Sequence, residues 1–128
     1  MSASSLDTIR ERMAKAARAA DRDPADVTLV AVSKQQPWEH VAPVLAAGQR
    51  VFAENRVQEA ETRWAERRSE IELRLIGPLQ SNKAKEAVAF FDVIETVDRE
   101  KLARALAERL PRGCGVVFRG FGRPGGRA

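Results

Sequence analysis

The residue in this chain best suited to covalent chemistry is a lysine that follows the first predicted strand. Lys34 comes just after the β-branched run at 27–32, which is typical of a strand buried on both sides. Active sites of parallel α/β folds lie at the C-terminal ends of the strands, so this amine would lie at the mouth of an apolar sheet. Partial desolvation there favours the neutral amine, which is the form that attacks an aldehyde. An ordinary surface lysine at the junction of a strand and a loop fits the position as well.

A second polar cluster follows the second predicted strand. It consists of Glu54, Asn55 and Arg56, directly after the strand expected at 50–53. The Asn55 amide can hydrogen-bond a ring oxygen, and the Arg56 guanidinium can bind an anion. A helix cap at Asn55, with Glu54 and Arg56 in solvent, explains this cluster equally well.

A third cluster follows the strand expected at 73–76. Gly77 and Pro78 break that strand, and residues 80–82 then offer polar side chains at the same end of the sheet. A turn followed by a helix cap accounts for Asn82. It does not account for three consecutive strands that all end in polar clusters.

The elements that position these clusters alternate between strand and helix. A first helix, capped by Ser4 or Ser5, is expected to run to about residue 20, and Asn82 and Asp98 are expected to cap the last two helices. The strands are expected at 27–32, 50–53, 73–76 and 93–96, and the helices that follow them at 37–47, 57–67, 82–90 and 98–110. Repeated strand–helix units predict a parallel sheet covered by helices. An open doubly wound sheet fits this order, and so do four units of a (β/α)8 barrel, which needs ~200 residues or more when complete.

A compositional break divides the chain near residue 110. Residues 1–110 hold 18 basic and 18 acidic side chains, whereas 111–128 hold four arginines and no acid, which accounts for the net charge of +4. Six of the eight glycines also lie in this tail. We therefore predict a partial barrel domain at 1–110 and an irregular Gly/Arg-rich tail at 111–128, in which only 116–118 has strand character. No specific nucleic acid partner is expected, because a nucleic-acid domain more often carries its basic face within the folded part.

The composition also argues against several other classes of protein. No stretch approaches the ~20 apolar residues of a membrane span, and the N-terminus lacks the basic start and apolar run of a secretory signal. We therefore expect a cytoplasmic protein with no membrane partner. A single cysteine, Cys114, excludes an internal disulfide, and the lone His40 does not indicate a metal centre.

The polar clusters resemble the motifs of one family. The segments read Ala-Val-Ser-Lys at 31–34, Glu-Asn-Arg-Val-Gln-Glu at 54–59, Ile-Gly-Pro-Leu-Gln-Ser-Asn-Lys at 76–83 and Thr-Val-Asp at 96–98. In order and spacing they resemble the pyridoxal phosphate homeostasis proteins, single-domain barrels related to the N-terminal domain of alanine racemase. The resemblance covers roughly residues 5–110. It implies an α/β fold that is the N-terminal half of a (β/α)8 TIM-type barrel, with about four βα units after a leading helix.

The resemblance also implies a cofactor and two residues that bind it. Lys34 matches the lysine that forms a Schiff base with the aldehyde of pyridoxal 5'-phosphate, and Asn55 matches a polar residue that lines the pocket. The family is associated with buffering and delivering this cofactor inside the cell, so apo-enzymes that depend on it are the expected macromolecular partners. No catalytic residue and no metal ligand are assigned.

Two alternatives remain open. The first is a racemase-like or decarboxylase-like barrel enzyme that uses the same lysine. Barrel enzymes with this cofactor need a second acid/base group, often Tyr or Cys, but the chain has no Tyr and Cys114 lies in the tail. The second is single-strand binding by the Arg/Gly tail, which is short and has no regular repeat.

The tail departs from the family pattern. The family continues with a fifth strand and three more units, which carry the phosphate-binding residues late in the barrel, and residues around 116–118 do not match that continuation. We therefore expect a C-terminal truncation, for example by a change of reading frame. Such a chain would bind the cofactor more weakly and would self-associate through exposed barrel edges.

Overall fold

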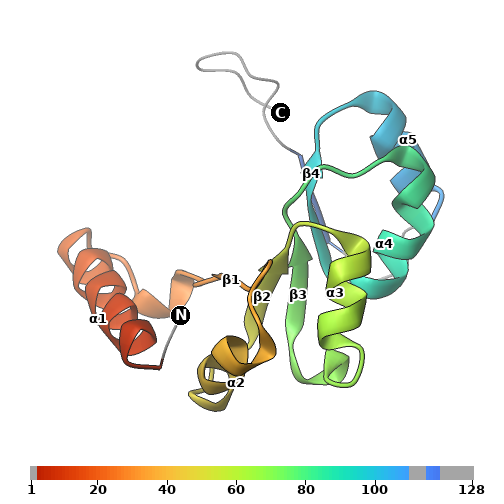
Figure 1. The fold of residues 1–128 in the computed structure, drawn as a ribbon. Coiled ribbons are helices and arrows are strands. Elements are labelled where there is room, and N and C mark those ends of the chain that lie inside the picture. The colour runs from red at the N-terminus through yellow and green to blue at the C-terminus, as the bar shows by residue number, and fades with distance from the viewer. Residues whose placement is uncertain (1–2, 110–114, 119–128) are drawn as a thin grey trace.

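The computed structural model describes residues 3–109 and 115–118 and shows an alternation of helices and strands (Figure 1). The helices are α1 (Ala3–Ala19), α2 (Trp38–Ala46), α3 (Val57–Trp64), α4 (Ala84–Phe90) and α5 (Glu100–Ala107). The strands are β1 (Ala31–Val32), β2 (Val51–Glu54), β3 (Glu72–Leu75), β4 (Val93–Val97) and β5 (Gly115–Phe118). Short 3-10 turns occupy Pro24–Asp26, Arg68–Glu70 and Ser81–Lys83.

The strand order identifies the architecture. The five strands form one sheet in the order β1-β2-β3-β4-β5, and every neighbouring pair is parallel. A doubly wound sheet reverses its strand order at a switch point, whereas a (β/α)8 barrel adds each strand beside the previous one. Helices α3, α4 and α5 follow one another along one side of the sheet (Figure 1). The chain therefore has the α/β fold of the N-terminal half of a (β/α)8 barrel, as the sequence predicts.

The hydrophobic core lies between the sheet and its helices. The register aligns Phe52 with Leu73, and Leu75 with Ile94, so these four side chains share one face. All of them are buried, and they pack in one cluster with Trp64 and with residues of α2, α4 and α5. We call this helix-covered side the outer face of the sheet.

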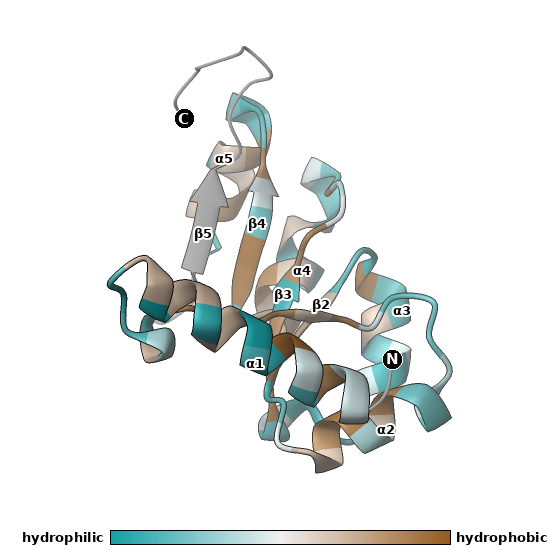
Figure 2. Ribbon diagram, turned by 90° about the vertical axis from the view of Figure 1, so that its left-hand side faces the viewer, coloured by the Kyte–Doolittle hydropathy of each residue, from teal (hydrophilic) through white to brown (hydrophobic). Residues whose placement is uncertain are grey.

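The opposite side, the inner face, is different in character. Strand alternation and register place Val32, Ala53, Arg74 and Val93 together on it. Val32 is 38% exposed although it is a large aliphatic residue. β4 begins hydrophobic and becomes polar further along its length (Figure 2). The inner face is therefore mixed, since the fully buried Ala53 lies between the exposed Val32 and the partly exposed Arg74.

The predicted helix caps are not observed. Ser4 and Ser5 lie within α1 rather than before it. Asn82 lies in the 3-10 turn Ser81–Lys83, where the backbone closes on itself through the Lys83 N–H and the Gln80 carbonyl (2.9 Å). Asp98 instead pairs with the Arg99 guanidinium at 2.7 Å. In the last two cases other contacts replace the expected side-chain cap.

Part of the tail belongs to the sheet. Gly115–Phe118 pair with β4 as a parallel fifth strand. In this segment the β-branched pair Val116 and Val117 favours extended structure, as the strand character noted at 116–118 within the tail indicates. The proposed boundary near 110 lies outside the described residues, and so does Cys114.

The described part of the chain shows no feature of a membrane span or a metal centre. None of its helices is both long enough and apolar enough to cross a bilayer. Its His, Cys, Asp and Glu side chains form no group of three or more suited to a metal ion.

Candidate functional site

Lys34 lies at the C-terminal end of the sheet, as the sequence predicts. The Ser33 N–H donates to the Ala53 carbonyl at 3.0 Å, which extends the β1–β2 ladder by one residue. Strand alternation therefore places Lys34 on the inner face, with Val32. Its side chain is exposed, and within the described ranges it forms no hydrogen bond or ion pair. The partial desolvation that we expected is not observed, because the Lys34 side chain is exposed.

The backbone around Lys34 makes a tight turn. Gln35 has a φ of 57°, in the left-handed region that few non-glycine residues adopt. The Gln36 N–H donates to the Ser33 carbonyl at 3.1 Å, and the Gln35 N–H donates to the Glu59 carboxylate at 2.5 Å. A side chain from α3 thus helps to hold the turn that carries Lys34.

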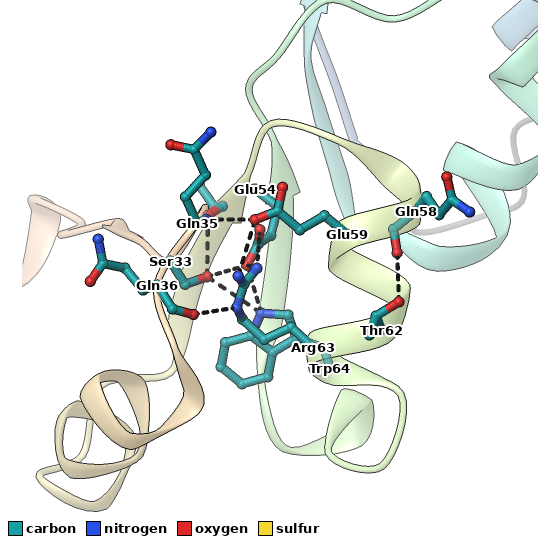
Figure 3. A network of polar contacts seen from close by, with 10 residues as sticks. Ser33, Gln35, Gln36, Glu54, Gln58, Glu59, Thr62, Arg63 and Trp64 are labelled. Carbon is teal, nitrogen blue, oxygen red and sulfur yellow. Dashed lines mark hydrogen bonds and ion pairs between the residues drawn. The ribbon is translucent and has the colours of Figure 1, made fainter.

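A fully buried carboxylate lies directly behind this turn. Glu54, at the end of β2, is 0% exposed. Its carboxylate accepts hydrogen bonds from Ser33 Oγ (2.5 Å), Trp64 Nε1 (3.1 Å) and Arg63 Nη1 (2.8 and 2.9 Å), as Figure 3 shows. A buried charge is tolerated when it is paired and hydrogen-bonded, and Glu54 satisfies both conditions.

Arg63 connects the buried carboxylate to the Lys34 turn. Besides Glu54, its guanidinium contacts the Gln36 carbonyl through Nε (3.0 Å) and Glu59 through Nη2 (3.0 Å). The pKa of Glu59 lies below its ordinary value of 4.5, chiefly because its carboxylate accepts the Gln35 N–H and, to a smaller extent, because it is hydrogen-bonded to Arg63. At neutral pH Glu59 is therefore ionised.

Asn55 follows β2 and is half-buried. Its backbone lies against Gly77, where an added Cβ would come within 2.2 Å of the Asn55 carbonyl oxygen. This close approach requires glycine at position 77. Asn55 also lines a groove of about 700 Å³ together with Gln80 and Lys83, but Lys34 does not line it. The structure brings Lys34 and Asn55 to the same end of neighbouring strands without placing them in one cavity.

The sequence analysis missed the network behind the turn. Of the two readings left open for this cluster, the one with Glu54 and Arg56 both in solvent is wrong for Glu54, which is fully buried, whereas Arg56 is exposed. The signal was present in the alternation of β2, because Glu54 lies two residues after the core residue Phe52 and so shares its face. The position of Arg63, nine residues later, gave no comparable signal.

The inner face carries its own charged group next to β3. Arg74 pairs with Glu72 at 2.8 Å and with Glu95 at 3.7 Å. All three side chains are partly exposed, at 22%, 41% and 25%. The arginine on the same face as Lys34 is therefore already engaged by two carboxylates.

Comparison with known proteins gives a consistent result. Residues 4–117 match the family described as "Alanine racemase, N-terminal domain". The chain is 42% identical over 112 residues to the "Pyridoxal phosphate homeostasis protein" of Pseudomonas aeruginosa, covering 87% of this chain and 49% of that protein. It is 37% identical to the Escherichia coli protein of the same name, covering 85% and 48%. The chain thus spans about half the length of the curated relatives it matches.

Solved structures are similar as well. PipY of Synechococcus elongatus, solved with PLP bound, is 44% identical with a TM-score of 0.63, and the match covers 78% of this chain and 47% of PipY. An unknown protein from Bifidobacterium adolescentis is 31% identical with a TM-score of 0.74, covering 84% and 48%.

Proposed function

This chain belongs to the alanine racemase N-terminal domain family, and on that premise we propose that it binds pyridoxal 5'-phosphate covalently through Lys34. The observation that carries the proposal is the position of Lys34, an exposed amine at the C-terminal end of β1 with no partner among the described residues. The names of the curated relatives and the PLP bound to PipY support the choice of cofactor.

The chemistry needs only the amine of the protein and the aldehyde of the cofactor. The Nζ of Lys34, when unprotonated, would hold the cofactor through a carbon–nitrogen double bond made with loss of one water molecule, so neither an oxidant nor a reductant would be required. When bound, pyridoxal 5'-phosphate supplies an electron-withdrawing ring. The residues of the 33–36 turn fit this role, because they leave the Lys34 side chain exposed and hold the backbone around it.

Attachment through Lys34 alone should be weak. Charge-assisted hydrogen bonds to an anion contribute ~1.5–3 kcal/mol each, and the arginine that shares the inner face, Arg74, is occupied by Glu72 and Glu95. We therefore propose that this chain of 128 residues holds the cofactor less tightly than one of its longer relatives does. A dissociation constant equal to that of such a relative would contradict this part of the proposal.

The biological role that we propose is cofactor homeostasis. A weakly held, reversibly attached cofactor suits a protein that buffers pyridoxal 5'-phosphate in the cytoplasm and passes it to apo-enzymes, rather than one that turns over a substrate. The names of the relatives support homeostasis, and the absence of Tyr from the chain removes one common second acid/base group. Racemisation of alanine by the purified chain would contradict the non-enzymatic role.

A cofactor titration followed by absorbance tests the proposal. We expect a saturable spectral change with the wild-type chain, its loss in Lys34→Ala, and its retention in Lys85→Ala. Lys85 is the matched control, because it is an exposed lysine on α4, away from the turn. The same spectral change in Lys34→Ala as in wild type would refute attachment through Lys34.

A further inference from the structure

We infer that Glu59 is a positioning residue for Lys34 and that it acts through the backbone N–H of Gln35. The inference deepens the proposed function and rests on it. It concerns a side chain on α3 that lies 24 residues from the turn it holds. None of the sequence motifs that point to Lys34 assigns this role.

The first observation is that Lys34 has no polar partner among the described residues. In the described part of the chain its side chain makes no hydrogen bond or ion pair, so the backbone of the 33–36 turn sets the direction in which the amine leaves the sheet. The residue that follows it, Gln35, is held at a φ of 57°. A non-glycine residue keeps this conformation when its surroundings enforce it.

The second observation is that Glu59 supplies this enforcement. Glu59 occupies the third position of α3, where a glutamate often accepts the N–H of its own helix cap. Here its carboxylate accepts the Gln35 N–H at 2.5 Å instead, and the Arg56 cap has no side-chain hydrogen bond. The carboxylate that would usually cap the start of its own helix is directed instead at the turn beside Lys34.

The third observation is that Glu59 is itself anchored to the core. Arg63 contacts Glu59 at 3.0 Å and the fully buried Glu54 at 2.8 Å, and its Nε donates to the Gln36 carbonyl (Figure 3). A continuous series of charged contacts therefore runs from the buried carboxylate through Arg63 to Glu59 and on to the turn. Such a supporting layer orients a reactive group through rigid neighbours rather than through direct contact.

Reductive labelling of the full chain tests the role of Glu59. The chain is mixed with pyridoxal 5'-phosphate, reduced with borohydride, and the initial rates of labelling at Lys34 and Lys85 are measured by peptide mass spectrometry. We expect Glu59→Ala to slow labelling at Lys34 about tenfold relative to Lys85, which corresponds to about 1.4 kcal/mol. Hydrogen exchange at the Gln35 amide should accelerate in the same variant.

Two variants serve as controls. Glu66→Ala removes the same charge from an exposed residue just after α3 that forms no ion pair in the described part of the chain, so both readouts should equal wild type. Glu59→Gln keeps an oxygen that can accept the Gln35 N–H but loses the charge toward Arg63. Its Lys34 rate should lie between those of wild type and Glu59→Ala.

The outcomes distinguish failure of the positioning role of Glu59 from failure of cofactor attachment at Lys34. A wild-type chain that labels Lys34 ahead of Lys85, with no change in Glu59→Ala, overturns the positioning role and leaves the proposed function in place. Equal labelling of Lys34 and Lys85 in wild type overturns both. Glu59→Ala does not fold if it shows no thermal unfolding transition where Glu66→Ala shows one, and Glu59→Gln then takes its place in the test. A wild-type labelling rate at Lys34 in Glu59→Gln overturns the inference, and a reduced rate supports it.

Discussion

The two faces of the sheet differ in how deeply their side chains are buried. On the outer face, Phe52, Leu73 and Ile94 are completely buried beneath the helices. On the inner face, Val32 is 38% exposed, and the most prominent side-chain contact is the partly exposed pair of Arg74 and Glu72. The difference indicates that the outer layer carries most of the buried apolar contacts that stabilise the fold, whereas the inner face contributes fewer.

The two faces meet at the C-terminal end of β1 and β2. There the buried Glu54 belongs to the outer layer, while Lys34, one residue beyond Ser33, lies on the inner face. The amine is thus exposed although the backbone that carries it is fixed from behind. Substitutions should therefore separate stability, which depends on the outer layer, from reactivity, which depends on the turn.

The largest difference in stability between the two faces is expected when a large outer-face side chain is removed. Trp64 is 0% exposed and packs against Phe52 with ring centroids 4.8 Å apart. Trp64→Ala should cost ~3–5 kcal/mol of unfolding free energy, the usual range for a buried aromatic residue. Val32→Ala on the inner face should stay within about 1 kcal/mol. Urea denaturation measures both, and equal losses would show that the inner face is also a stabilising core.

The ion pairs of the two faces should also differ in how much they contribute to the free energy of unfolding. Arg63→Met leaves the buried Glu54 carboxylate without its cation, and breaking a buried pair in this way typically costs ~3–5 kcal/mol. Arg74→Met removes a partly exposed pair, for which ~0.2–1 kcal/mol is typical. Denaturation of the two variants under identical conditions tests the contrast. A larger loss in Arg74→Met would contradict the assignment of the outer face as the stabilising one.

Substitution of Gly77, which lies against the Asn55 backbone, should cause an intermediate loss of stability. A Cβ at position 77 would lie 2.2 Å from the Asn55 carbonyl oxygen, so the two loops must move apart in Gly77→Ala. Overpacking of this kind costs ~1–3 kcal/mol. Thermal denaturation compared with Ala89→Gly, a helix-interior change at an exposed position of α4, checks the size of the loss. A fully stable Gly77→Ala chain would mean that the two loops are not in close contact.

The smallest effect is expected from pH. The pKa of Glu59 is lowered in the folded chain, first by the Gln35 N–H and then by Arg63. Its contribution to stability is therefore complete above its ordinary value of 4.5 and is lost as the pH falls below that value through the folded pKa. In this acidic window the wild-type chain should lose more unfolding free energy than Glu59→Ala does. Parallel pH dependences of the two chains would refute the contact.

Much of the fold follows from local sequence patterns. The alternation of strand and helix was predicted correctly because each element carries its own hydrophobic periodicity. The strand expected at 27–32 is shorter than predicted, at Ala31–Val32. Among the described strands β1 pairs with β2 alone, and the Leu29 carbonyl accepts a hydrogen bond from the Gln49 side chain at 2.6 Å. The strand order could not be read from periodicity, because it depends on which distant segments become neighbours.

The site was predicted in part. Lys34 and Asn55 lie, as predicted, just after the C-terminal ends of two adjacent parallel strands. The hydrogen-bonded support behind Lys34 was not predicted. Arg63 reaches Gln36 across 27 residues and Glu54 across nine, and long-range contacts of this kind depend on the path of the backbone and on side-chain rotamers. The position of the residue that we propose to carry the chemistry was therefore visible in the sequence, while the residues that hold its turn became visible only in the fold.

The most direct test of the account is the distribution of reduced pyridoxal 5'-phosphate over the lysines at positions 15, 34, 83, 85 and 101 of the wild-type chain. Because only Lys34 lies on the turn held from behind by the Glu54–Arg63–Glu59 network, we predict that brief borohydride reduction places most of the label on Lys34. A distribution that simply follows the exposure of the five amines would contradict the claim that this fold presents Lys34 to the cofactor.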